Sequence, residues 1–159
     1  MELANKILKH PQYLRYIELN SKAETNRVFC KHDLQHALDV ARVACIISME
    51  KKLEISKEVL YAAALLHDIA KWKQYRYGVD HAAEGAVLAR EILEDIGVNC
   101  VSVEEITEAI KTHRGQEMEK SLLGAVLYES DKVCRPCMFC KSIDKCNRFL
   151  NGEKPEFKY

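Results

Sequence analysis

The chain has 159 residues, of which 48% are hydrophobic and 30% are charged, and this composition indicates one folded domain and excludes a disordered chain. Its 24 basic and 24 acidic residues give a net charge of zero, so no strong field favours nucleic acid or an anionic membrane as a partner. The sequence has no apolar run of the roughly 18 residues that span a bilayer and no apolar block of a secretion signal, so we expect a cytoplasmic protein.

The predicted elements are helices throughout, because apolar residues recur at helical spacing and the chain has only three prolines and six glycines. We expect helices over about residues 2–9, 12–19, 33–50, 57–73, 81–96, 103–113 and 121–134. The fold class is therefore an all-α, single-domain helical bundle. Within it we expect N-terminal helices (1–28) that pack on a core (29–135), and a cysteine-containing C-terminal extension (136–159) of the same domain.

Ionisable residues interrupt the apolar faces of five of these helices. His36, for example, shares a face with Val40 and Val43. The full set is His36, His67, Asp68, His81, His113 and Asp131. Six buried polar groups would each need separate hydrogen-bond partners, whereas one shared cation satisfies them together. We therefore predict a metal site, and the mixture of imidazole and carboxylate suits iron, manganese, zinc, cobalt or nickel better than calcium.

At these residues the chain, from about Phe29 to Arg148, resembles the HD-domain superfamily of metal-dependent phosphohydrolases. The resemblance rests on HALDVAR, ALLHDIAK and LYESDKVCR, which begin at residues 36, 64 and 127. It implies an HD-type helical bundle whose first metal is bound by His36, His67, Asp68 and Asp131. DHAAEGAVLAREIL and EAIKTHRG resemble further segments of dinuclear members, which implies that His81 and His113 hold a second metal and that Asp68 bridges the two.

Three more residues are candidates for substrate binding. Lys71 follows His67 by one helical turn, so it can meet a phosphate oxygen beside the catalytic Asp68, or simply end its helix as a favourably placed cation. Arg114, next to His113, is a second candidate for the substrate. His32, one turn before His36, is a third, although it also suits a plain helix start.

Seven cysteines include a crowded group near the C-terminus. Cys134, Cys137, Cys140 and Cys146 have the spacing C-x2-C-x2-C-x5-C, and in a reducing compartment such crowding favours metal over disulfides. This group is predicted to bind zinc or an iron–sulfur cluster, with the distance to Cys146 favouring zinc, or else to be four unrelated buried thiols.

The resemblance implies an enzyme that hydrolyses a phosphate ester or anhydride of a nucleotide or dinucleotide-like substrate, by attack of a metal-activated water. It would use one or two divalent transition-metal ions at the His/Asp site. Two alternatives stay open, namely a di-iron oxygenase of the HD type and a metal- or redox-sensing interaction module that uses the cysteines. We expect a small phosphorylated substrate as the partner, neither membrane nor nucleic acid, and we keep a homodimer open.

Overall fold

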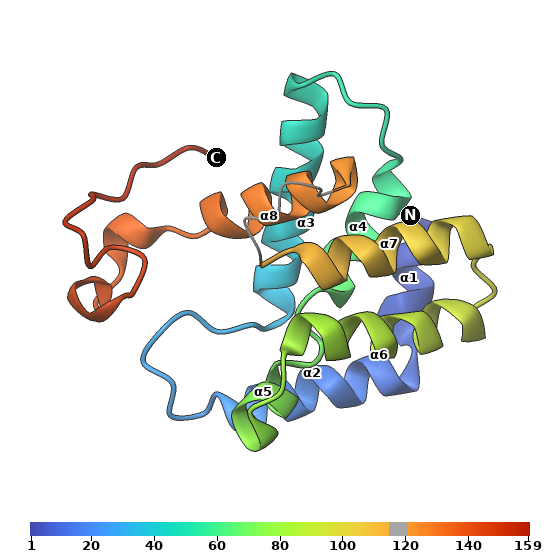
Figure 1. Ribbon diagram of the computed structural model, residues 1–159, viewed down its shortest axis with the longest axis horizontal. Coiled ribbons are helices and arrows are strands. Elements are labelled where there is room, and N and C mark those ends of the chain that lie inside the picture. Colours follow the sequence, from blue (N-terminus) through green and yellow to red (C-terminus); the bar gives the residue numbers. More distant parts are fainter. Residues whose placement is uncertain (115–120) are drawn as a thin grey trace.

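The computed structural model describes residues 1–114 and 121–159, and Figure 1 shows the arrangement of its elements. In these two ranges the chain forms eight α-helices, two short 3-10 helices and no strand, which confirms the all-α prediction. The α-helices are α1 (Glu2–Lys9), α2 (Pro11–Ala23), α3 (Leu34–Glu50), α4 (Lys57–Leu66), α5 (Lys71–Tyr77), α6 (His81–Asp95), α7 (Cys100–Thr112) and α8 (Leu122–Val133), and the 3-10 helices are η1 (Cys137–Phe139) and η2 (Ile143–Lys145). None of the helices in these ranges combines the length and the apolar character needed to cross a membrane.

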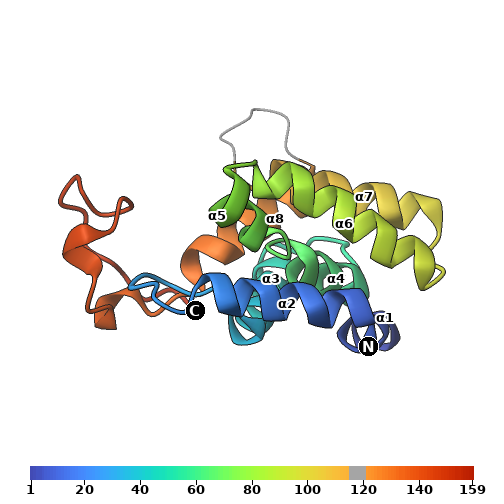
Figure 2. The same cartoon turned by 90° about the horizontal axis from the view of Figure 1, so that it is seen from below.

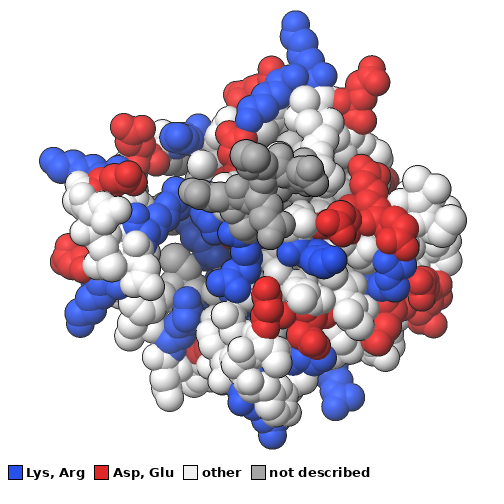
Figure 3. Space-filling view, in the orientation of Figure 1, with Lys and Arg blue, Asp and Glu red and all other residues white. Residues whose placement is uncertain are grey.

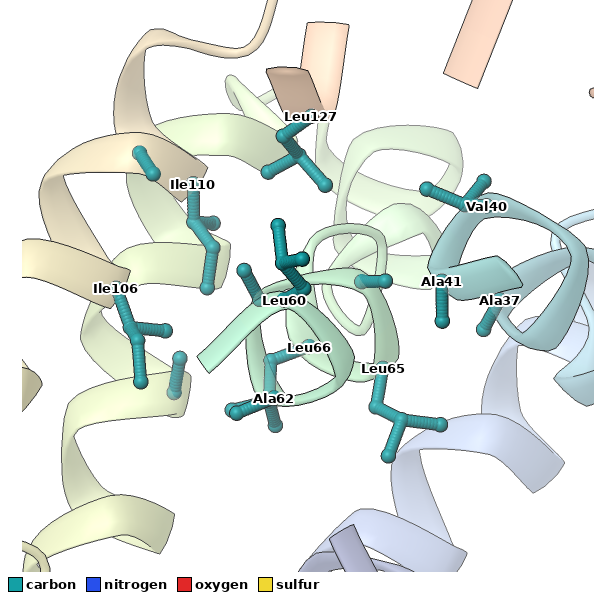
Figure 4. Packing of buried hydrophobic residues seen from close by; sticks show 14 of the residues in the cluster. Ala37, Val40, Ala41, Leu60, Ala62, Leu65, Leu66, Ile106, Ile110 and Leu127 are labelled. Atoms are coloured by element: carbon teal, nitrogen blue, oxygen red, sulfur yellow. The ribbon is translucent and has the colours of Figure 1, made fainter. Parts of the chain in front are cut away.

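Helix α4 is the centre of the hydrophobic core. It packs against α1, α3, α6, α7 and α8, and Figure 4 shows its apolar side chains among those of α3, α7 and α8. Ala62, Ala63 and Ala64 are fully buried, and their small side chains let the neighbouring helices approach closely. Because α4 is surrounded in this way, the residues that follow its last turn are also buried. His67 and Asp68 occupy that position.

The structure corrects one predicted boundary, because the single helix expected over residues 57–73 is two helices. α4 ends at Leu66, and α5 begins at Lys71 after a stretch of turns. The break is held by the buried side chain of Asn20 in α2. Its Nδ2 donates to the Asp68 carbonyl at 2.9 Å, and its Oδ1 accepts from the Trp72 amide at 2.8 Å. A side chain 48 residues away in sequence thus satisfies backbone groups that a continuous helix would have paired internally.

The two ends of the chain are attached to the core in different ways. α1 packs on α4 and α2, and α2 packs on α5, so the N-terminal helices are part of the bundle. Residues 136–159, in contrast, extend from the end of α8 beyond the bundle, beside the loop that connects α2 to α3 (Figures 1 and 2). No residue from 136 to 159 is buried, so this extension has no hydrophobic core of its own.

Candidate metal centre

Four of the predicted metal ligands meet at one end of α4. His36 projects from the first turn of α3 and Asp131 from the last turn of α8, while His67 and Asp68 directly follow α4. Each of the four offers one ligand atom, and these atoms all lie within 4.8 Å of one another. All four residues are more than nine-tenths buried. The structure therefore brings together the complete first set that the sequence predicted.

Asp68 connects this set to a second one, which contains His81 and His113. Its Oδ2 lies 3.0 Å from His67 Nε2 and 3.8 Å from His36 Nε2. Its Oδ1 points the other way, 3.1 Å from His81 Nε2 and 3.8 Å from His113 Nε2. Asp68, His81 and His113 again offer ligand atoms within 4.8 Å of one another. One carboxylate thus has an oxygen in each set, the position that a bridging ligand requires.

The hydrogen bonding of these residues fits a metal. His67 Nδ1–H donates to the Ala64 carbonyl at 2.7 Å, and His113 Nδ1–H donates to the Ile110 carbonyl at 2.5 Å. These bonds orient each ring and leave the Nε2 lone pair directed toward Asp68, as in most metal-ligating histidines.

Three ligand atoms have no hydrogen bond of their own. They are His67 Nε2, Asp68 Oδ1 and His81 Nε2, which are buried and unpartnered in the described part of the chain. The Asp68 carboxylate lies near both nitrogens, but in directions that do not form hydrogen bonds. Unpaired buried polar atoms are strongly destabilising, and a divalent cation among them would satisfy all three together.

The electrostatics of the site favour the protonation states that Asp68, Asp131 and His113 need as metal ligands. Burial opposes ionisation of Asp68, but the neighbouring histidines, with His67 first, hold the pKa of this carboxyl well below its usual range. Burial likewise opposes ionisation of Asp131, but its interactions with His36 and then His67 outweigh this effect, so the pKa of Asp131 is lowered. Burial, aided by the charge of His67, lowers the pKa of His113 to about 4. The set therefore favours ionised carboxylates beside a neutral His113.

A side-chain cation already contacts the first set. Arg135 Nη2 lies 2.9 Å from His36 Nε2 and 3.6 Å from Asp131 Oδ1. Because a guanidinium can only donate, His36 Nε2 acts here as an acceptor and presents a lone pair. On the other side of the same ring, Cys134 Sγ lies 3.8 Å from His36 Nδ1. Arg135 was absent from the predicted site, although its place one turn after Asp131 could have indicated it.

The three predicted substrate residues lie around the centre at different depths. The Lys71 ammonium, largely buried, is 3.9 Å from Asp68 Oδ1 and 3.4 Å from His81 Nδ1. His32 is buried, with its Nε2 at 3.9 Å from Asp68 Oδ2. Arg114 is exposed, and its Nη1 lies 3.5 Å from Asp80 Oδ1. Burial lowers the pKa of Lys71, which the charge of Asp68 partly offsets.

One buried carboxylate beside these residues was not predicted. Glu24 accepts hydrogen bonds from the backbone N–H of His32 at 2.7 Å, from His32 Nδ1 and from the Tyr75 hydroxyl at 2.7 Å. It thereby fixes the orientation of the His32 ring toward Asp68. Burial opposes its ionisation, but the bonds from His32 and Tyr75 outweigh it and lower the pKa of Glu24 to about 2. In the sequence Glu24 lies in the polar stretch KAETNR, where no periodicity distinguishes it.

This carboxylate predicts a pH dependence of stability. Because the pKa of Glu24 is about 2 in the folded chain and 4.5 ordinarily, its contribution is complete above the higher value and is lost as pH falls toward the lower one. We expect the free energy of unfolding to fall less steeply over this window in Glu24→Gln than in the wild type. Denaturant titrations at several pH values measure both slopes, and equal slopes would show that Glu24 is not held ionised by the fold.

The His/Asp centre opens into a cavity of about 440 Å³, whose wall includes Asp68, His81, His113 and Asp131. Two aromatic residues, Phe29 and Phe149, also line it. The described basic residues in its wall are Arg27, Lys71, Arg114, Lys132, Arg135 and Arg148. Figure 3 shows basic side chains gathered around a hollow on this face of the molecule. A cavity with this lining suits an anionic ligand next to the Asp68 carboxylate.

The predicted cysteine group is arranged differently from the His/Asp ligands. In the described ranges, the sets of ligand atoms that lie within 4.8 Å of one another contain no cysteine. Cys137, Cys140 and Cys146 line the cavity, whereas Cys134 lies against His36 and donates to the Asp131 carbonyl at 3.6 Å.

The second ligand set gives a prediction about metal content. His81→Ala and His113→Ala are each expected to lower the metal content by about one ion per chain, because each removes a ligand of the second set only. Elemental analysis of protein dialysed against metal measures this. His10→Ala is the matched control, since His10 is buried but bonded to Asp95, away from the site. Unchanged content in both variants would leave a single metal, with His81 and His113 in other roles.

Comparisons with known proteins agree on one family description. The model of the HD domain matches residues 33–135. The crystal structure of a predicted HD superfamily hydrolase from an uncultured Thermotogales bacterium matches with a TM-score of 0.60 and 29% identity, covering 84% of this chain and 74% of that one.

Similar sequences include one protein of similar length and several longer ones. An uncharacterized protein from Clostridium beijerinckii is 40% identical over 99% of this chain and 98% of its own length. Ribonuclease Y from Desulfotalea psychrophila is 31% identical, and that from Acetivibrio thermocellus 27%, each over 78% of this chain. The matched regions are 22% and 21% of those two proteins, so this chain spans about a fifth of the ribonuclease Y relatives.

Proposed function

We propose that this chain, which belongs to the HD-domain family, is a metal-dependent phosphohydrolase. Its substrate would be a nucleotide or a related phosphate ester or anhydride. One observation carries the proposal. The Asp68 carboxylate, with an oxygen in each of two ligand sets, lies in the wall of a cavity that is otherwise rich in arginine and lysine. Cation ligands and anion-binding side chains thus face the same space, as phosphoryl transfer requires.

The six residues of the two sets would hold one or two divalent transition-metal ions. Such an ion supplies a water of lowered pKa as the nucleophile and stabilises negative charge on the phosphoryl oxygens. The chain's own residues bind and orient the substrate. Lys71 is close enough to Asp68 to contact a phosphoryl oxygen beside it, and Arg114 at the cavity wall can hold a second one.

His32 is placed to move a proton. Because Glu24 accepts the Nδ1 hydrogen bond, His32 Nε2 is the ring nitrogen that faces Asp68. A substrate oxygen bound beside Asp68 would lie within reach of this nitrogen, which can donate to the leaving group. The buried position of His32 limits competition by water for that hydrogen bond.

The lining of the cavity supports a substrate with more than one phosphate. Six basic side chains exceed what a single phosphate can contact, and Phe29 and Phe149 offer apolar faces on which a base or sugar can pack. A nucleoside polyphosphate or a dinucleotide has both parts. RNA shares this chemistry, and the relatives named ribonuclease Y make a short RNA a necessary member of any substrate panel.

The test is phosphate release from a panel of nucleoside mono-, di- and triphosphates, dinucleoside polyphosphates, p-nitrophenyl phosphate and a short RNA, with manganese, iron or cobalt added. We expect hydrolysis of at least one nucleotide. Lys71→Ala is expected to lower its kcat/KM by about tenfold to a hundredfold. Lys141→Ala, which removes an exposed lysine of the extension, is the matched control. Oxygen consumption by the iron-loaded protein without hydrolysis of any member would overturn the proposal in favour of an oxygenase.

A further inference from the structure

The cysteines of the C-terminal extension face the molecule, while several of its large apolar residues face solvent. Met138 is 47% exposed and Phe139 is 82% exposed, yet Cys137 and Cys140, which flank them, are half-buried. Cys146 is also half-buried, between exposed Lys145 and exposed neighbours that follow it. A segment folded by hydrophobic burial would show the opposite pattern. The thiols, together with Ile143 and Phe149, are therefore the side chains that this segment directs into the cavity.

Two 3-10 turns place these thiols. The Cys140 amide donates to the Cys137 carbonyl at 3.0 Å, which closes the turn around η1, and the Cys146 amide donates to the Ile143 carbonyl at 2.9 Å in η2. The extension is joined to the α2–α3 loop by a hydrogen bond from Ser142 Oγ to the Val28 carbonyl at 2.9 Å. Figures 1 and 2 show this loop and the extension on the same side of the bundle.

The loop contributes a fourth thiol to the same place. Cys30, two residues after Val28, lines the same cavity as Cys137, Cys140 and Cys146. Cys134 is not among the residues of that wall. It is turned toward α3 and the His36 ring instead.

We propose that Cys30, Cys137, Cys140 and Cys146 form one four-thiolate metal site, with Cys134 outside it. The site would take a soft thiophilic centre, either a zinc ion or an iron–sulfur cluster. The group predicted from the spacing contained Cys134. In the proposed site Cys30, from the α2–α3 loop, takes its place. This inference does not depend on the proposed hydrolase activity.

Charge and stability both support a metal at this position. Four thiolates are compatible with the surrounding cations, since Arg27, Lys132, Arg135 and Arg148 line the same cavity. Burial raises the pKa of the Cys137 thiol, and the charge of Arg148 in the same cavity wall partly offsets this effect. The extension buries no residue of its own, and metal ligation would add to the hydrogen bonds that hold its turns.

The distances between the sulfur atoms favour an iron–sulfur cluster over a single zinc ion. A tetrahedral zinc ion with Zn–S bonds of about 2.3 Å holds its sulfurs roughly 3.8 Å apart. In the structure no three of the described cysteines have their sulfurs within 4.8 Å of one another. An iron–sulfur cluster spreads its thiolates over different irons and so accommodates a wider arrangement.

The decisive comparison is Cys30→Ser against Cys134→Ser in the full-length protein, purified without oxygen. Zinc, iron, acid-labile sulfide, visible absorption and thiols reactive in the folded state are measured for each. We expect Cys30→Ser to lose the zinc, or the iron with its sulfide and colour, and to make three further thiols reactive. Cys134→Ser should keep the metal. Loss of zinc identifies the single ion and loss of iron and sulfide identifies the cluster, and either result supports the site.

Two further variants, Cys100→Ser and Cys137→Ser, serve as controls for this comparison. Cys100→Ser removes an exposed thiol and should change nothing except the thiol count. If Cys134→Ser proves too unstable to purify, Cys137→Ser is compared with Cys30→Ser instead. Both variants should then lose the same metal. The proposal is overturned if Cys30→Ser retains the metal that Cys137→Ser loses. It is also overturned if Cys30, Cys137, Cys140 and Cys146 all titrate freely in the folded wild type.

Discussion

Replacing Asp68 with alanine is expected to remove the bound metal and to lower hydrolysis by at least about a thousandfold. The reason is its position, because Asp68 is the one residue that belongs to both ligand sets, with Oδ2 toward His67 and Oδ1 toward His81. Without it each set loses a negative charge that imidazoles cannot supply. Metal-based stabilisation of a phosphoryl transition state is worth several kcal/mol, and about 1.4 kcal/mol corresponds to a factor of ten in rate.

The measurement is elemental analysis together with turnover of whichever nucleotide the panel identifies. Glu104→Ala is the matched control, because it removes an exposed carboxylate that pairs with Arg90 on the surface. Asp68→Asn, which keeps the volume and removes the charge, separates ligation from packing. If Asp68→Ala retains the wild-type metal content while remaining folded by circular dichroism, the assignment of the centre is wrong.

Replacing Asn20 with alanine is expected to destabilise the fold by about 2–4 kcal/mol and also to reduce activity. The side chain satisfies the Asp68 carbonyl and the Trp72 amide, and a buried backbone group left unpaired costs about 1–3 kcal/mol. Because one of these groups belongs to Asp68 itself, the change also loosens the backbone that positions the bridging carboxylate. Misplacement of a reacting group by about 1 Å can lower the rate by about a hundredfold.

Denaturant unfolding and kcat/KM of the purified variants test this prediction. Asn20→Asp keeps the acceptor for the Trp72 amide but loses the donor to Asp68, so its activity should fall although one of the two bonds remains. Asn5→Ala removes an exposed asparagine whose Nδ2 bonds the Met1 carbonyl, and it should leave both quantities nearly unchanged. Equal stabilities of Asn20→Ala and the wild type would contradict the role of this side chain.

The clustering of the candidate ligand residues could be predicted from the sequence because helical periodicity is a local signal. His36 and Asp131 each lie at an inward position of an apolar helix face, and the fold is built by burying those faces together. The break between α4 and α5 had no such signal. The stretch around His67 has strong helical character, and what interrupts the helix is Asn20, whose role arises only after α2 has packed against α5.

The contrast between local sequence patterns and tertiary contacts also explains why the roles of Glu24 and Cys134 differ from the sequence-based prediction. Glu24 lies in a polar stretch, and its burial results from contact with Tyr75, 51 residues later. Cys134 was grouped with the other thiols because it is near them in sequence, but its position directly after α8 turns it toward His36. Spacing along a chain predicts which residues can meet across one turn of helix, whereas Cys30 reaches the extension through tertiary packing alone.

The wide separation of the ligands along the chain has a consequence for how the protein folds. Residues 36, 67, 81, 113 and 131 approach one another only when α3, α4, α6, α7 and α8 are all docked, so partly folded chains would have little affinity for the metal. A ligand that binds only the native state stabilises it by mass action, by about 1.4 kcal/mol for each tenfold rise in free metal above the dissociation constant. The melting temperature should therefore rise with metal concentration, and a chelator should lower it toward a plateau that reports the stability of the bundle alone.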